Sequence, residues 1–87
     1  MDWYVYIIES SDSSLYTGIT KDIDRRFKEH AEKTKGAKFF RGRITVKVVY
    51  KEAGHTRSTA TKREIEIKSL SKMEKIKLIS NSLNLKC

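Results

Sequence analysis

Alternating aromatic and β-branched positions predict three strands. The first covers Trp3 to Ile8 and the second covers Leu15 to Thr20. Turn-forming residues at 10–14 separate the two strands, so they should pair as an antiparallel hairpin. A third strand is predicted across Arg43 to Tyr50, where Ile44, Val46, Val48 and Tyr50 alternate with other residues. Ala53-Gly54-His55 is expected to break that strand.

Three helices are predicted from caps and apolar spacing. Asp22 can cap a helix from Ile23 to about Glu32, and a second helix should span Ser58 to Leu70. The capping-box pattern that begins at Ser71 opens a third helix, which should end near Ser80.

These elements follow the order strand–strand–helix–strand–helix–helix. We therefore expect an α+β fold, with a three-stranded antiparallel or mixed sheet flanked by helices. One domain should cover residues 1–80, and residues 81–87 should form a C-terminal tail.

The charge balance is strongly basic. The 87 residues include 19 Lys and Arg against 11 Asp and Glu, which gives a net charge of +8 and a pI near 9.8. A small domain of this charge attracts polyanions such as nucleic acid, although a solvated lysine-rich surface is the alternative. A basic loop after the first helix holds Lys38, Arg41 and Arg43, and we expect these to bind a phosphate backbone together with Lys21 and Arg25.

The same composition excludes several classes of protein. Cys87 is the single cysteine, so neither an intramolecular disulfide nor a cysteine-based metal site is expected. No secretory signal and no membrane-length apolar run is apparent, so we expect a cytoplasmic protein that does not bind membranes.

Two tyrosines should meet within the hairpin. Tyr4 and Tyr6 face the same side of the first strand, and strand pairing should bring Tyr6 close to Tyr16. Neighbouring phenols can position a water and a phosphate oxygen, although tyrosines in strands often only pack. Gly18 interrupts the second strand and predicts a close approach of its backbone to another group.

The first helix supplies a cation and a histidine. Arg26 and His30 are spaced i, i+4, and they should lie at the rim between core and solvent, whereas Arg25 points elsewhere. An arginine there can stabilise charge on a phosphate, and a histidine can transfer protons near neutral pH. The alternative is a solvated basic helix face.

Glu64 is a candidate metal ligand. Ala60, Glu64 and Ile67 form one stripe of the second helix, and a carboxylate on a core-facing stripe is costly unless it is paired or binds a metal such as Mg²⁺. Thr61 and Glu64 also match a capping box, but Ser58 to Ala60 already fit a helix, which disfavours that alternative.

Together these features resemble the GIY-YIG nuclease superfamily. Tyr4-Val5-Tyr6 is similar to its first motif and Tyr16-Thr17-Gly18 to its second, with Tyr4 in place of Gly and Thr17 in place of Ile. The run Leu15 to Thr20 resembles the small stand-alone UPF0213 or YhbQ-like members. So do Asp24-Arg25-Arg26 with His30, and Ala60 through Glu64 with Lys68.

The resemblance implies a metal-dependent endonuclease that hydrolyses nucleic-acid phosphodiester bonds, with DNA favoured over RNA and a role in repair or recombination. It implies that Glu64 holds one divalent ion, Mg²⁺ or Mn²⁺. Tyr6 and Tyr16 would line the active centre, one of them activating the attacking water. Arg26 would stabilise the phosphate, His30 would assist proton transfer, and Gly18 would keep the backbone close. The alternative is a non-catalytic nucleic-acid-binding module of the same fold.

Overall fold

The computed structural model describes residues 2–32 and 44–84. The elements in chain order are β1 (Trp3–Ser10), β2 (Leu15–Thr20), α1 (Ile23–Glu32), β3 (Thr45–His55), α2 (Arg57–Lys68) and α3 (Lys72–Asn84). The expected α+β fold and its order of elements are confirmed. No helix of the described residues is long and apolar enough to cross a membrane.

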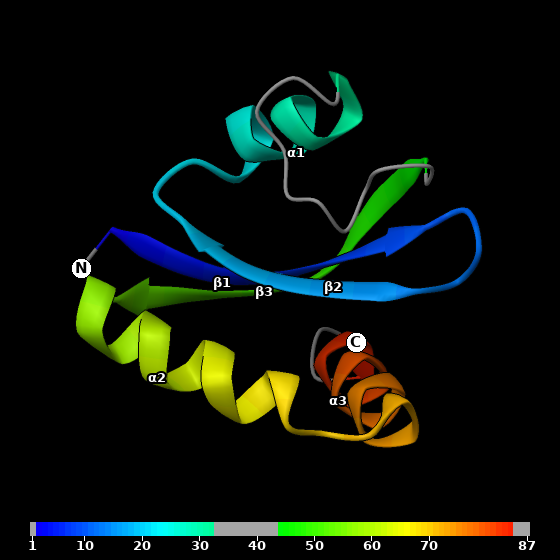
Figure 1. The fold of residues 1–87 in the computed structure, drawn as a ribbon. Helices are drawn as coiled ribbons and strands as arrows, with labels where there is room; N and C mark the ends of the chain where they lie inside the picture. The colour runs from blue at the N-terminus through cyan, green and yellow to red at the C-terminus, as the bar shows by residue number, and fades with distance from the viewer. Residues whose placement is uncertain (1, 33–43, 85–87) are drawn as a thin grey trace.

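The three strands form one antiparallel sheet in the order β2-β1-β3. Helix α1 covers one face of the sheet, and α2 and α3 cover the other (Figure 1). Alternate residues of β1 therefore enter two separate cores. Val5 and Ile7 pack with residues of α2, whereas Tyr6 and Ile8 pack beneath α1.

β3 is longer than the sequence predicts. The strand continues through Gly54 to His55, so the expected break at Ala53-Gly54-His55 is wrong. Trp3 pairs with His55 and Val5 pairs with Glu52, so β3 holds one extra residue there. Gly54 has φ +78°, the left-handed backbone that such a bulge uses, and the strand absorbs the glycine instead of ending at it.

Two of the three helices, α1 and α3, begin at the predicted caps. The Arg25 backbone N–H donates to Asp22 Oδ1 at 3.1 Å, which closes the start of α1. In the capping box of α3, the Ser71 N–H donates to Glu74 Oε1 at 2.9 Å and the Glu74 N–H donates to Ser71 Oγ at 3.2 Å.

Two helix boundaries differ from the prediction. α2 covers Arg57–Lys68 rather than Ser58 to Leu70, because Thr56 is its N-cap. α3 continues to Asn84, four residues beyond the expected end at Ser80, so residues 81–84 are helical rather than tail. Residues 85–87 lie outside the described part of the chain.

Candidate active site

Three aromatic rings from three elements meet on the α1 side of the sheet. Tyr6 comes from β1, Tyr16 from β2 and His30 from α1, and we call these three residues the tyrosine centre. The ring centroid of Tyr6 lies 6.3 Å from those of both Tyr16 and His30, and the Tyr16 and His30 centroids are 5.2 Å apart. The expected proximity of Tyr6 and Tyr16 is thus present.

Gly18 makes room for the tyrosine centre. It pairs with Tyr6 across the hairpin, while Tyr16 pairs with Ile8. A Cβ at position 18 would lie 2.5 Å from Tyr6 Oη, 2.7 Å from Tyr6 Cζ and 3.1 Å from Tyr16 Cε2. The Tyr6 ring therefore lies directly over the backbone of β2, which only glycine permits.

A buried hydrogen bond joins the phenol and the imidazole. Tyr6 Oη and His30 Nε2 are 3.1 Å apart, and the two residues are 1% and 0% exposed. Burial, and then the Tyr16 phenol, raise the pKa of Tyr6 to about 12, while a hydrogen bond from Arg26 opposes this rise. Burial, and then the Arg26 charge, lower the pKa of His30 to about 4. Both groups are therefore neutral at pH 7, and the Tyr6 hydroxyl can donate to His30 while it accepts from Arg26.

Arg26 is less exposed than Arg25, and both arginines pair with Glu29. The Arg26 guanidinium is 30% exposed, and its Nη1 lies 3.0 Å from Glu29 Oε1. Arg25 is 74% exposed, with Nε 3.6 Å from Glu29 Oε2. The expectation that His30 shares the rim with Arg26 is wrong, because α1 packs closely on the sheet and covers the imidazole completely.

Glu64 lies on α2, which covers the face of the sheet opposite to α1 (Figure 1). Thr56 and Thr59 form the capping box of α2, so Glu64 lies well inside the helix and the Thr61–Glu64 alternative is excluded. Ala60 and Ile67 are both fully buried, as their stripe predicts.

The Glu64 carboxylate is 20% exposed, and Lys68 Nζ lies 3.4 Å from its Oε2. Lys68 Nζ also lies 6.0 Å from the Tyr16 ring centroid, and Glu64 contributes to the raised pKa of Tyr6. Lys68 thus links the Glu64 carboxylate to the Tyr16 ring at the β2 side of the sheet. By contrast, Glu66 is 66% exposed and pairs with Arg63.

A second polar network, which the sequence did not indicate, joins β3 to α2. Glu52 accepts hydrogen bonds from the Tyr50 hydroxyl, from Arg63 Nε at 2.9 Å and from His55 Nε2 at 3.0 Å. These bonds lower the pKa of Glu52 against the effect of its burial, the largest single influence. Glu52 and His55 lie beyond the predicted end of the strand, so no strand periodicity drew attention to them.

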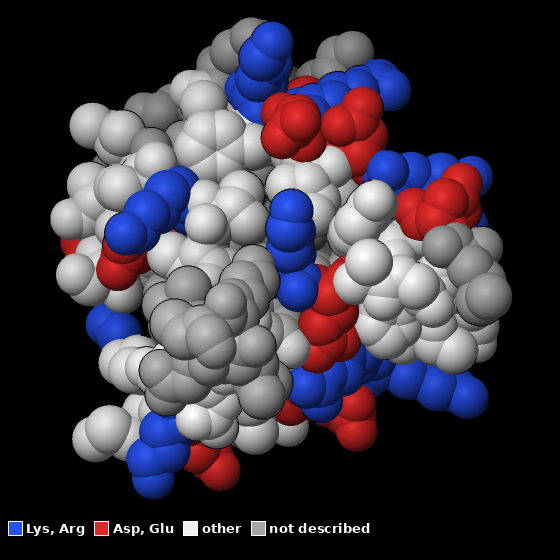
Figure 2. All heavy atoms as spheres, turned by 180° about the vertical axis from the view of Figure 1, so that it is seen from behind, with Lys and Arg blue, Asp and Glu red and all other residues white. Residues whose placement is uncertain are grey.

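The predicted basic contacts are only partly described. Lys38, Arg41 and Arg43 lie outside the described residues, whereas Lys21 and Arg25 are exposed. On the face opposite to that of Figure 1, basic and acidic side chains are interspersed (Figure 2). The described residues of that face therefore present no continuous basic stripe.

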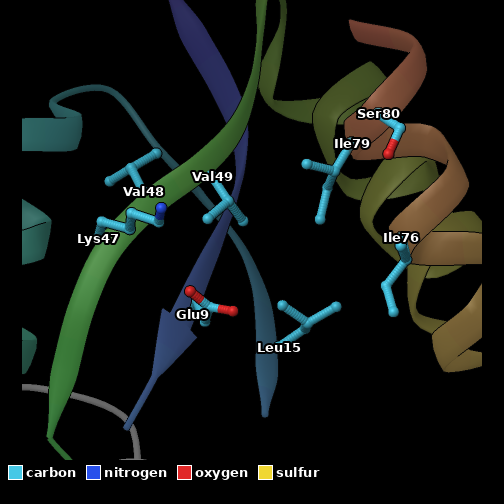
Figure 3. A pocket seen from close by; sticks show the side chains of 8 residues that line it. All are labelled: Glu9, Leu15, Lys47, Val48, Val49, Ile76, Ile79 and Ser80. Atoms are coloured by element: carbon cyan, nitrogen blue, oxygen red, sulfur yellow. The ribbon is translucent and has the colours of Figure 1, made fainter. Parts of the chain in front are cut away.

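An apolar hollow of about 440 Å³ lies between the sheet and α3. Its lining is mostly apolar and includes Leu15, Val49, Ile76 and Ile79, together with the charged residues Glu9 and Lys47 (Figure 3). Its lining includes no residue of the tyrosine centre, so it is separate from the candidate active site.

Comparison with known proteins identifies the family of the chain. The family model of the GIY-YIG catalytic domain matches residues 2–77. A UPF0213 protein of Desulfotalea psychrophila is 48% identical over 80 residues, which cover 92% of this chain and 73% of that protein. A UPF0213 protein of Haloquadratum walsbyi is 52% identical over 75 residues, covering 86% and 83% of the two chains. The solution NMR structure of a UPF0213 protein from Bacillus halodurans is 46% identical, with a TM-score of 0.58 and coverage of 92% and 84%.

Proposed function

The chain belongs to the GIY-YIG family, and on that premise we propose that it is a divalent-metal-dependent endonuclease acting on DNA, in repair or recombination. The observation that supports this most strongly is the set of contacts that joins the hairpin tyrosines to α2. The Tyr6 and Tyr16 ring centroids are 6.3 Å apart, and Lys68 Nζ lies 6.0 Å from the Tyr16 ring and 3.4 Å from Glu64 Oε2. A phosphate there would meet a phenol, a guanidinium and a carboxylate at once.

The donor set suits a hard cation that takes few protein ligands. No group of three His, Cys, Asp or Glu side chains among the described residues could hold a metal, so Glu64 would act as a single carboxylate ligand. Mg²⁺ is commonly bound by one or two carboxylates together with waters and substrate phosphates, and Mn²⁺ also favours oxygen ligands. A divalent ion on Glu64 would supply charge to the phosphoryl group and the leaving oxygen.

Burial supports different roles for the two phenols. Tyr6 is 1% exposed, and its pKa of about 12 keeps it protonated, so it serves as a fixed hydrogen-bond donor that positions the site. Tyr16 is half-buried, so it is the tyrosine that can meet the attacking water. His30 is fully buried, so it would orient Tyr6 rather than exchange protons with substrate. Arg26 would offset the charge that develops on the phosphate.

Cleavage assays with matched carboxylate variants test the proposal. Labelled branched, single-stranded and duplex DNA, and RNA of the same sequences, are incubated with and without Mg²⁺. We expect Glu64→Gln to abolish cleavage and leave binding nearly intact, because the amide is isosteric but a poor metal ligand. The control Glu66→Gln changes an exposed carboxylate on another face of α2 and should cut normally. Cleavage by Glu64→Gln at the parental rate would refute the proposal.

One contact favours a second candidate, a non-catalytic nucleic-acid-binding module. Lys68 Nζ, 3.4 Å from Glu64 Oε2, already supplies a counter-charge to the carboxylate without a metal. A binder predicts a salt-sensitive mobility shift with no fragments in Mg²⁺, whereas the nuclease predicts metal-dependent fragments.

A further inference from the structure

Two cations lie near the Trp3 ring, at the end of the sheet away from Tyr16. Lys21 Nζ is 5.7 Å from the Trp3 ring centroid, and Arg57 Cζ is 5.9 Å from it. Lys21 follows β2 directly after the Tyr4–Thr20 pair, and Arg57 is the first residue of α2. Three elements thus bring their ends to one half-buried ring.

These two cations are exposed. Neither takes part in an ion pair within the described part of the chain, where the ion pairs involve Arg25, Arg26, His55, Arg63 and Lys68. The other cations near the candidate site, Arg25, Arg26, Arg63 and Lys68, all pair with carboxylates. A cation–π contact at an exposed site is worth only about 0.5–1 kcal/mol, so two like charges near one ring still attract an anion.

The distance from this pair to the active site follows from two independent elements. α2 runs beside β2 in the opposite direction, from Arg57 near Trp3 to Lys68 near Tyr16. At a rise of about 1.5 Å per helical residue, Arg57 lies about 10 Å from Glu64 and about 16 Å from Lys68 along the axis. Along β2, the five steps from Tyr16 to Lys21 give about 17 Å at about 3.4 Å per residue. A B-form strand advances about 3.4 Å per nucleotide, so these distances correspond to about three to five nucleotides.

We propose that Trp3, Lys21 and Arg57 form a second contact for the nucleic-acid backbone, about three to five nucleotides from the phosphate bound beside Glu64. This inference rests on the proposed function for its ligand. Such a contact fixes the register of the strand across the active site and reads no bases.

Trp3 itself provides the measurement, because it is the single tryptophan of the chain. The intact protein in EDTA is titrated with a labelled duplex of about 12 base pairs, which can span both sites. DNA anisotropy reports all binding, and tryptophan emission reports binding at Trp3. We expect both signals to saturate at the same DNA concentration. Binding by anisotropy with unchanged Trp3 emission would overturn the inference.

Charge variants supply a second measurement. The double variant Lys21→Gln/Arg57→Gln should make the slope of log affinity against log salt less negative by about 1–2, since each lost phosphate contact contributes about 0.9. The control Lys62→Gln/Lys72→Gln removes the same charge from exposed positions on α2 and α3 and should change the slope less. Equal slopes for the two double variants would overturn the contact.

The two proposals fail in different ways. Cleavage in Mg²⁺ together with unchanged Trp3 emission on DNA binding would refute the second contact and leave the nuclease proposal standing. A change in Trp3 emission without cleavage by the parent protein would refute the nuclease proposal and leave the second contact standing.

Discussion

Replacing Gly18 with alanine tests whether the tyrosine centre depends on the bare backbone of β2. The new Cβ would lie 2.5 Å from Tyr6 Oη, whereas a non-bonded carbon and oxygen normally stay at least about 3.3 Å apart. The phenol or the strand must therefore move by about 0.8 Å. Tyr6 is 1% exposed and held by His30 at 3.1 Å, so little free space can absorb the shift.

The expected loss has two parts. Overpacking of this kind typically costs about 1–3 kcal/mol in the free energy of unfolding, which urea denaturation measures. A displacement near 1 Å of a catalytic group can also reduce a reaction rate by about 100-fold, so the cleavage rate per folded molecule should fall as well. Ile7→Val is the control, because it removes one buried methyl group from the core beneath α2 and costs about 0.5–1.5 kcal/mol. Tyr6 and Tyr16 belong to the other cluster.

A double-mutant cycle locates the clash. Tyr6→Phe removes the nearest atom but leaves Cζ, which is 2.7 Å from the new Cβ, so part of the penalty should disappear when Gly18→Ala is introduced together with Tyr6→Phe. We expect a coupling free energy of at least about 0.5 kcal/mol. If Gly18→Ala unfolds and cleaves like the parent, or if the two substitutions are additive, the reasoning is refuted.

Three further predictions concern stability. Burial holds the pKa of His30 at about 4 in the folded protein, below its ordinary value of 6.5, so the unfolded chain takes up the proton first as the pH falls. The free energy of unfolding, measured by urea denaturation, should therefore fall by up to about 3 kcal/mol from pH 7 to pH 4. His30→Asn should flatten this dependence. Glu52→Gln weakens the bonds from Arg63 and His55 and should cost about 2 kcal/mol, whereas Glu66→Gln should cost less than about 0.5 kcal/mol. Ser13 has φ 67° in the β1–β2 loop, so Ser13→Gly should raise the free energy of unfolding by about 0.5–1 kcal/mol.

Each of these predictions can fail clearly. A pH dependence that persists in His30→Asn would place the titrating group elsewhere. Equal losses for Glu52→Gln and Glu66→Gln would show that the partly buried Glu52 network adds no stability. A destabilised Ser13→Gly would show that the loop gains nothing from relief of its backbone.

Local signals in the sequence predicted the hairpin and the caps of α1 and α3. Asp22 and the Ser71–Glu74 pair act within one helical turn, so no knowledge of the rest of the chain was needed to find them. The i, i+4 spacing likewise placed Arg26 and His30 on one face of α1. How deeply that face is buried depends on α1 packing against β1 and β2, which helical periodicity does not report.

The features that sequence reasoning missed depend on pairing between distant segments. Gly54 looks like a strand breaker until β1 is present to pair on both sides of it. Glu52 looks like a surface charge until α2 brings Arg63 against it, 11 positions later in the chain. Likewise, no periodicity joins Trp3, Lys21 and Arg57, because only the folded sheet places the ends of three elements together.

The left-handed residue in β3 controls which way the C-terminal half of the chain departs from the sheet. In a regular strand, residues three apart point to opposite sides, yet Glu52 and His55 contact each other because the extra residue reverses the alternation. α2 begins two residues after His55, so its starting direction inherits this reversal. A one-residue deletion at Ala53 or Gly54 would restore the regular alternation and send the helix off the opposite side of the sheet. The Glu64 carboxylate would then be separated from Tyr16, although every residue of α2 and of β2 remained unchanged.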